Sequence, residues 1–236
     1  MIDWRRVVGR PERIRGDDLY YHIILRCNNG ERMFASGAEC AFFLEHLKRY
    51  VDQYKCEVHN YTIMPSHVHL MLMTTSGNHV DIVLRDICSC TARSYNKRRT
   101  RSGHFWRHRF RSKIITDDAY ALACLRYNHR NPLVGGVVQS LDDWKWSAYH
   151  YYARGMPDEI IKPLPTYLNL GSTGTERRER YVEVVADPGA PAALERGLFE
   201  GRFGEGTYWY ERARREVNAA IFRYIYCANY KRVPGT

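Results

Sequence analysis

Two histidines separated by one residue are the first side chains here whose types and spacing could do chemistry. His67 and His69 flank Val68 within the run Met64-Pro-Ser-His-Val-His-Leu70. Side chains alternate faces along a strand, so an extended backbone would point both imidazoles the same way and Val68 into a core. Two neighbouring imidazoles on a rigid strand make half of a site for a divalent metal ion. A His-x-His pair taken alone, however, is more often two ordinary solvent-facing residues than two ligands.

A second group of candidates lies in the run Arg126-Tyr-Asn-His-Arg-Asn131. If this run is helical, Tyr127 and Asn131 project from one face, one turn apart. A tyrosine hydroxyl can act as the nucleophile of a phosphodiester transfer that proceeds without ATP, because a covalent phosphoenzyme conserves the bond energy. The chain has 18 tyrosines, so a core tyrosine and a helix-ending asparagine are the plainer interpretations of these two residues.

The two groups together would complete a metal site. His67, His69 and the side-chain oxygen of Asn131 form a mixed set of imidazole and oxygen ligands that suits Mg²⁺ or Mn²⁺. The remaining coordination positions would go to phosphate oxygen and water. Such an ion stabilises the charge that develops on the phosphate, whereas an unassisted phenol, with a pKa of about 10, is mostly protonated at neutral pH.

The elements that must position these residues follow the order β-α-β-β-α-β-α. This order predicts an α+β fold, a ferredoxin-like (RRM-like) antiparallel sheet with helices on one face and the histidine strand at its centre. The helix that carries Tyr127 should end at Asn131, because Pro132 disfavours helical backbone at the residue before it. Strands are expected at 19–27, 57–63, the histidine run and 110–115, and helices at 37–54, 80–96 and 117–131.

Two regions are expected along the chain. Residues 1–150 form the predicted catalytic domain, and residues 151–236 form a mainly helical C-terminal extension with a possible role in DNA binding. The extension divides at a flexible joint over 171–174 and a second break over 187–191, with a charged helix at 176–185 and a basic amphipathic helix at 207–231. A basic arm over 1–16 could clamp a phosphate backbone or remain a solvated tail. The aromatic residues at 143–152 favour packing over base stacking.

Composition narrows the class of protein. The hydrophobic share of 44% over 236 residues is that of a globular protein, and the sequence has neither an apolar leader nor a run long enough to cross a membrane. A cytoplasmic location is therefore expected. The seven cysteines include no Cys-x-x-Cys pair and are interpreted as reduced core thiols.

Charge points to a polyanionic partner. The chain has 36 Lys and Arg against 26 Asp and Glu, a formal net charge of +10, with 18 tyrosines and 5 tryptophans interleaved. A basic surface with exposed rings suits nucleic acid, which offers phosphates and stackable bases. A basic protein with no nucleic-acid role would show the same composition.

Five segments in a fixed order give a more specific signal. They are Tyr20–Gly30, Met64–Leu70, Ser102–Lys113, Arg126–Pro132 and Trp146–Tyr149. With them the chain resembles the REP-associated tyrosine transposases, bacterial members of the HUH superfamily of single-stranded-DNA transposases and nucleases with an IS200-like fold. Each segment alone is a weak match, but five in the same order are strong. Asn128 departs from the family pattern, which more often has an apolar residue there, and Ser66 stands where Asn is common.

The resemblance implies a function and a site. Tyr127 would be the nucleophile, His67 and His69 metal ligands and Asn131 the third ligand, for Mg²⁺ or Mn²⁺. The protein would be a metal-dependent single-stranded-DNA endonuclease and strand transferase that leaves a 5′-phosphotyrosyl end and a free 3′-hydroxyl. Its substrate would be palindromic, REP-like hairpin DNA, and it would act as a monomer in the bacterial cytoplasm, close to the nucleoid.

Basic and polar residues inside or beside the matching segments are the expected DNA contacts. They are Arg26, Asn28, Arg107, Arg109, Lys113 and Arg126. Two other functions remain open from the sequence. One is a non-catalytic nucleic-acid-binding protein derived from such a transposase. The other is a metal-dependent hydrolase of small phosphoesters, which would turn over without DNA and would be indifferent to Tyr127→Phe.

Overall fold

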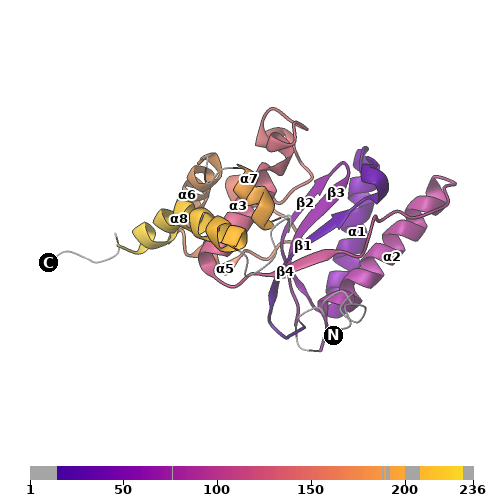
Figure 1. Ribbon diagram of the computed structural model, residues 1–236, viewed down its shortest axis with the longest axis horizontal. Coiled ribbons are helices and arrows are strands. Elements are labelled where there is room, and N and C mark those ends of the chain that lie inside the picture. The colour runs from indigo at the N-terminus through magenta and orange to yellow at the C-terminus, as the bar shows by residue number, and fades with distance from the viewer. Residues whose placement is uncertain (1–14, 76, 188, 190–191, 200–207, 231–236) are drawn as a thin grey trace, which may run out of the picture.

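The computed structural model describes residues 15–75, 77–187, 189, 192–199 and 208–230. Four strands form one sheet, and eight helices lie within the described residues (Figure 1). The strands are β1 (Tyr20–Arg26), β2 (Glu57–Met64), β3 (His67–Met73) and β4 (Arg111–Ile114). The helices are α1 (Gly37–Tyr54), α2 (Val80–Arg98), α3 (Asp118–Val134), α4 (Tyr149–Arg154), α5 (Pro165–Leu168), α6 (Gly174–Ala186), α7 (Ala192–Phe199) and α8 (Tyr208–Tyr230), with short 3-10 turns η2 (Asn28–Gly30) and η3 (Leu141–Asp143).

The sheet has the expected topology. Its strand order is β2-β3-β1-β4 and every neighbouring pair is antiparallel, which is the ferredoxin-like arrangement. The histidine strand β3 therefore lies centrally, as predicted. Across it, His67 pairs with Arg26 of β1 and with Met64 of β2. The site residues of β1 and β3 thus start from adjacent positions on one rigid surface.

Both faces of the sheet are covered, so the expectation of helices on one face was wrong. Helices α1 and α2 lie against one face and α3 lies on the other side (Figure 1). Strand alternation sends His67, His69 and Met71 to the α3 side, where the ring of His69 contacts that of Tyr127. The physical reason is that this second face also carries buried side chains: the apolar Ile24 and Met71 lie on it together with the polar His22, Asn60, Thr62 and His69. Apolar residues on both faces of a sheet require cover on both.

Helix α3 is longer than expected. It begins where Asp117 caps the helix by accepting a hydrogen bond from the backbone N–H of Tyr120 (2.7 Å). It then continues through Pro132 to Val134, so the predicted end at Asn131 was wrong. Proline removes one helical hydrogen bond, yet the turn still closes, because Gly135 N–H donates to the carbonyl of Asn131 at 2.8 Å. Pro132 itself is buried, so packing outweighs the local preference.

The C-terminal half packs onto α3. Helices α5, α6, α7 and α8 all contact it, and the long helix α8 agrees with the predicted helix at 207–231. The expected flexible joint at 171–174 is instead the ordered start of α6, where Thr173 and Glu176 form a capping box. Residues 1–14 of the expected arm, residues 188, 190 and 191 of the expected break, and the ends Thr207 and Lys231 lie outside the described residues.

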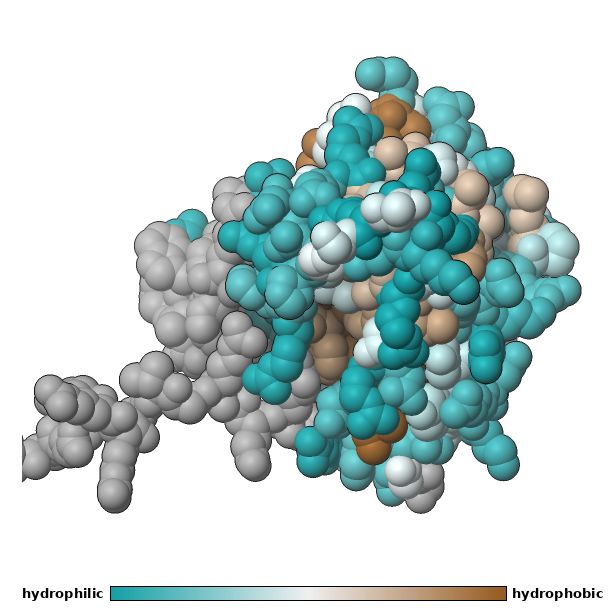
Figure 2. Space-filling view, turned by 90° about the vertical axis from the view of Figure 1, so that its right-hand side faces the viewer, coloured by the Kyte–Doolittle hydropathy of each residue, from teal (hydrophilic) through white to brown (hydrophobic). Residues whose placement is uncertain are grey.

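The outer surface and the thiols follow the composition. The side of the molecule formed by α1 and α2 is mostly hydrophilic (Figure 2). Six cysteines within the described residues are free thiols, and burial raises the pKa of Cys27 to about 12. None of the helices in the described ranges combines the length and apolarity that a membrane crossing requires.

Candidate active site

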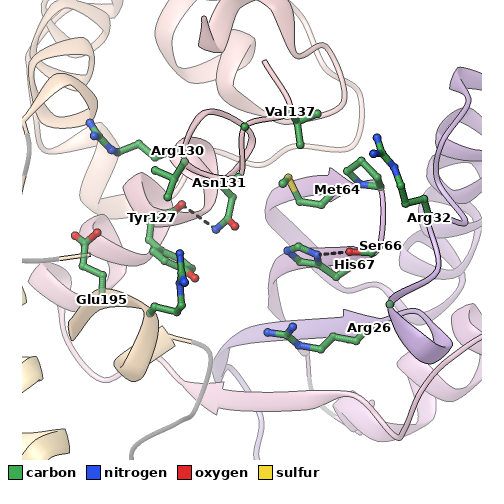
Figure 3. Close-up of a pocket in the computed structure, with 16 residues that line it drawn as sticks. Arg26, Arg32, Met64, Ser66, His67, Tyr127, Arg130, Asn131, Val137 and Glu195 are labelled. Atoms are coloured by element: carbon green, nitrogen blue, oxygen red, sulfur yellow. Dashed lines mark hydrogen bonds between the residues drawn. The ribbon is translucent and has the colours of Figure 1, made fainter. Parts of the chain in front are cut away.

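Strand β3 and helix α3 bring the predicted chemical residues together. His67, Tyr127 and Asn131 line one cavity of about 490 Å³. The side chains of Tyr127 and Asn131 point into this cavity towards His67 (Figure 3). His69 lies two residues further along β3, on the same face of the sheet, and is fully buried. Its ring centroid is 5.0 Å from that of His67 and 5.8 Å from that of Tyr127. Two residue pairs more than fifty positions apart thus meet at one point.

Each residue of the expected ligand set is tied to a neighbouring residue through one side-chain nitrogen. The Nδ1 atom of His67 lies 3.2 Å from Ser66 Oγ, and the Nδ1 atom of His69 lies 3.3 Å from His22 Nε2. The Nε2 atom of His69 is buried and has no hydrogen-bond partner among the described residues. Asn131 Nδ2 donates to the carbonyl oxygen of Tyr127 at 3.2 Å, which leaves the amide oxygen turned away from the helix.

This arrangement fits a small divalent cation. A buried nitrogen without a hydrogen bond is costly unless a ligand meets it, and metal-binding histidines characteristically tie their other nitrogen to a neighbour. Within the described residues no three His, Cys, Asp or Glu side chains are grouped to hold a metal. A cation here would therefore depend on Asn131 and on oxygens of a substrate or water in addition to the two imidazoles.

The charge state of His69 also suits a ligand. Burial lowers the pKa of His69 well below 6.5, and the nearby His67, His22 and Arg26 lower it further. The imidazole is therefore neutral at pH 7. A neutral imidazole keeps the lone pair that binds a metal ion.

Four arginines make the cavity strongly basic. They are Arg26, Arg32, Arg130 and Arg196, and Glu195 is the single carboxylate among the lining residues. Only Arg26 was expected from the sequence. Arg130 could have been found, because it follows Tyr127 by three residues on the same helix. The other two come from the loop after η2 and from α7, and no local sequence signal links them to Tyr127.

The other expected DNA contacts are not among the residues that line the cavity. Arg107 and Arg109 are exposed on the segment before β4, and the backbone N–H of Arg107 donates to the carbonyl of Arg26 at 2.8 Å. Asn28 begins the η2 turn, where its N–H donates to the Phe105 carbonyl at 2.8 Å. Lys113 lies on β4. Their contact with DNA stays a prediction.

Arg126 does not fit the expected role. Only 1% of it is exposed, so it offers no surface to a DNA strand. Its guanidinium forms an ion pair with Glu195 and donates from Nε to the carbonyl of Asp187 at 3.2 Å. Gly189 has a left-handed φ of +67°, and a Cβ at this position would collide with the Arg126 guanidinium. Arg126 therefore fastens the end of α6 and the start of α7 to α3.

Helix α7 contacts the candidate nucleophile, and no local sequence pattern indicates this contact. The ring of Phe199 lies 4.8 Å from that of Tyr127, 5.3 Å from that of Tyr120 and 6.0 Å from that of His22. Phe199 is 1% exposed. The tyrosine ring is thus held between Phe199 on one side and the edge of His69 on another, which restricts where its hydroxyl can point.

A buried hydrogen-bonded group fixes α3 against β2. His129 Nε2 lies 2.7 Å from Asn60 Oδ1, and His129 Nδ1 lies 2.5 Å from the Tyr181 hydroxyl. Burial lowers the pKa of His129 to about 3, so the ring is neutral and carries one proton. Because Asn60 Oδ1 only accepts, that proton is on Nε2, and Tyr181 donates to Nδ1. Tyr127, two residues earlier, inherits this fixed helix position.

Comparisons with known proteins give the family. Residues 16–131 match the sequence model of the family described as "Transposase IS200 like". A protein of Haemophilus influenzae described as a REP-associated tyrosine transposase is 29% identical over 119 residues, which cover 46% of this chain and 67% of that protein.

Solved structures agree in fold. The structure of a REP-associated tyrosine transposase bound to a REP hairpin superposes with a TM-score of 0.54 at 15% identity, covering 66% of this chain and 99% of that one. A crystal structure of a protein from Deinococcus radiodurans, described as a transposase, superposes with a TM-score of only 0.37 at 18% identity, covering 48% of this chain and 88% of that one. This second likeness is too weak to support an argument about the fold. Residues 16–131, which include both histidines, Tyr127 and Asn131, thus carry the sequence pattern of the IS200-like transposase family.

Proposed function

We propose that the protein is a metal-dependent single-stranded-DNA endonuclease and strand transferase that forms a 5′-phosphotyrosyl link through Tyr127. The observation that carries the proposal is the shared cavity, in which Tyr127 and Asn131 face His67 among four arginines. The match of residues 16–131 to a transposase family supports action on DNA. The structural neighbour was solved with a REP hairpin, which supports palindromic hairpin DNA as the substrate.

The reaction would conserve the energy of the phosphodiester bond. The Tyr127 hydroxyl oxygen attacks the scissile phosphorus, the bond from phosphorus to the 3′ oxygen breaks, and the 3′ oxygen leaves as a hydroxyl. The phenol loses one proton and the leaving oxygen gains one, so the step is balanced. A later 3′-hydroxyl can attack the phosphotyrosyl link and reverse these changes, which joins strands without ATP.

The residues around Tyr127 would supply orientation and charge. Mg²⁺ or Mn²⁺ bound by His67, His69 and Asn131 would polarise the phosphate. Phe199 and His69 restrict the tyrosine ring, which favours a near-attack geometry. The cavity arginines would neutralise strand phosphates. Each such contact to a single strand should make the slope of log affinity against log salt more negative by about 0.7.

Covalent adduct formation tests the proposal. The full chain is mixed with an end-labelled DNA hairpin that carries a short single-stranded foot, in the presence of Mn²⁺, and run on a denaturing gel. Wild type should give adducts that survive denaturation, and Tyr127→Phe, which removes one oxygen, should give none. Tyr120→Phe is a matched control, since Tyr120 is a buried tyrosine two turns earlier on the same helix; it should keep the adduct.

The histidines are tested by separating cleavage from binding. His67→Ala should abolish cleavage and leave hairpin affinity nearly unchanged, because metal binding serves the chemistry and the arginines serve affinity. A joint loss of both would make the histidines structural. Hairpin binding by wild type without any adduct would instead support the non-catalytic DNA-binding protein. Turnover of a small phosphoester without DNA, unaffected by Tyr127→Phe, would support the hydrolase.

A further inference from the structure

The side chain next to His69 is another histidine, and the sequence comparison with tyrosine transposases assigned it no role. His22 of β1 is 1% exposed and lies on the same face of the sheet as His67 and His69. Its Nε2 atom is 3.3 Å from Nδ1 of His69. This is the contact that occupies the nitrogen of His69 opposite the candidate cation site.

The two rings meet edge to edge. Their planes differ by only 7° and their centroids are 5.6 Å apart. The distance between the centroids is about the sum of three lengths: from the first ring centre to its nitrogen, from that nitrogen to the other nitrogen (3.3 Å), and from the second nitrogen to its own ring centre. The two centroids and the two nitrogens therefore lie nearly on one line, which places the rings in a common plane. This is the geometry of an in-plane N–H···N hydrogen bond and not of stacked rings.

The proton in this hydrogen bond is more stable on His69 than on His22. If His22 held it, the single proton of a neutral His69 would be on Nε2, a buried atom with no acceptor among the described residues. A buried N–H without an acceptor is destabilising, and such donors are rarer in proteins than unpaired acceptors. If His69 donates from Nδ1 instead, its Nε2 carries only a lone pair. The second arrangement is the cheaper one before any ligand arrives.

Asn128 lies beside His22. Burial is the main influence on the pKa of His22 and lowers it to about 3, while a side-chain interaction with Asn128 raises it. The Oδ1 atom of Asn128 is buried and has no hydrogen-bond partner among the described residues, which makes it the acceptor available to the Nδ1–H of His22. Asn128 is one of the two departures from the family pattern. The other, Ser66, contacts the Nδ1 atom of His67.

We propose that His22 is a positioning residue for the cation site, which accepts the Nδ1–H of His69, sets the plane of that ring and keeps its Nε2 lone pair directed at the ion. The proposal rests on the proposed function for the identity of the ion. Asn128 in turn holds His22 in the tautomer whose Nε2 is an acceptor. A neutral histidine here takes the place of the carboxylate or carbonyl that more commonly supports a metal-binding histidine.

Mn²⁺ affinity without DNA measures this role apart from catalysis. The full chain is titrated with Mn²⁺, and free ion is followed by electron paramagnetic resonance. His22→Phe keeps the ring but removes the acceptor, and should weaken Mn²⁺ binding about 10–100-fold, the usual effect of losing a support to a ligand. His22→Gln places an amide oxygen near the former Nε2 and should restore affinity to within about three-fold of wild type. Failure of glutamine to rescue, with both variants folded, would make His22 merely a packing residue.

The ¹⁵N NMR signals of the imidazoles give a second measurement on the wild-type protein without metal. His69 should show the Nδ1–H tautomer and His22 likewise, and Asn128→Leu should shift His22 towards a tautomer mixture. An Nε2–H tautomer at His69 overturns the proposal even if His22→Phe does not fold. Absence of Mn²⁺ binding by wild type would overturn the cation site and the proposed function, whereas Mn²⁺ binding that His22→Phe leaves unchanged would overturn only the role of His22.

Discussion

Replacing His129 should make the protein less sensitive to mild acid. Burial, with a smaller effect of His150, lowers the pKa of His129 from 6.5 to about 3. In the unfolded chain the same side chain takes up a proton as the pH falls below 6.5, while the folded protein does not. The unfolded state then binds more protons, so the stability that neutral His129 gives above pH 6.5 is lost progressively as the pH falls towards 3.

The size of this loss can be worked out for a convenient interval. One pKa unit corresponds to about 1.4 kcal/mol, so a single such histidine lowers the free energy of unfolding by about 2 kcal/mol between about pH 7 and about pH 5. Within this interval the figure depends on the unfolded pKa alone, provided that the folded pKa is below about 4.

His129→Gln is the variant that isolates the effect. Its amide N–H can still donate to Asn60, but the Tyr181 hydroxyl loses its acceptor, which costs about 1–3 kcal/mol at both pH values. That cost cancels when the pH 5 and pH 7 stabilities of one variant are subtracted. Urea unfolding followed by circular dichroism should show that the variant loses about 2 kcal/mol less than wild type over the interval. The exposed His104→Gln should behave as wild type. An equal loss in wild type and His129→Gln would refute the reasoning.

Three further predictions concern the helices around the site. Asp117→Ala should cost about 1 kcal/mol at neutral pH, because α3 loses its cap. Burial alone would raise the pKa of Asp117, but hydrogen bonds that include one from Arg214 lower it overall. The stability that this carboxylate contributes is therefore present above pH 3.8 and is lost as the pH falls. The gap between this variant and wild type should therefore close in urea titrations at about pH 2, and a constant gap would contradict it. Phe199→Ala should cost about 3 kcal/mol by leaving a cavity and should slow adduct formation more than it weakens hairpin binding; an unchanged melting temperature would count against this. Glu195→Gln should cost about 3 kcal/mol because Arg126 stays buried without a counter-charge, and Arg126→Met in the same chain should recover part of it; additive losses in that double-mutant cycle would show the pair to be uncoupled.

Much of the fold and the heart of the site follow from local pattern. Strand alternation places His67 and His69 on one face, and helical spacing places Tyr127 and Asn131 on another. Both inferences need only neighbouring residues, and the structure brings the two faces to one cavity. The order of strands and helices was enough for the topology, because a split β-α-β arrangement has few antiparallel solutions.

The failures share a cause, which is contact between distant segments. Pro132 obeys its local rule in isolation, but burial keeps it inside α3. Phe199 lies on an eight-residue helix whose role exists only through rings more than seventy residues away. In the sequence His22 is a single polar residue in an apolar strand, and its contact with His69 follows only from the pairing of β1 with β3. The second covered face did have a local signal, since the nearly continuous apolar run of β1 is typical of a strand buried on both sides.

The way in which α3 is enclosed has a consequence for dissecting this protein. Tyr127 packs on the ring of Phe199, Arg126 forms an ion pair with Glu195, and His129 forms a hydrogen bond with Tyr181. All three partners lie beyond residue 150. A polypeptide shortened to the region before residue 150 would lose all three contacts at once and would expose both apolar and charged side chains of α3 to water. Its inactivity would then say nothing about whether the tail grips nucleic acid. Charge reversals on the outward side of α8, in an otherwise intact chain, are the experiment that can separate scaffolding from grip.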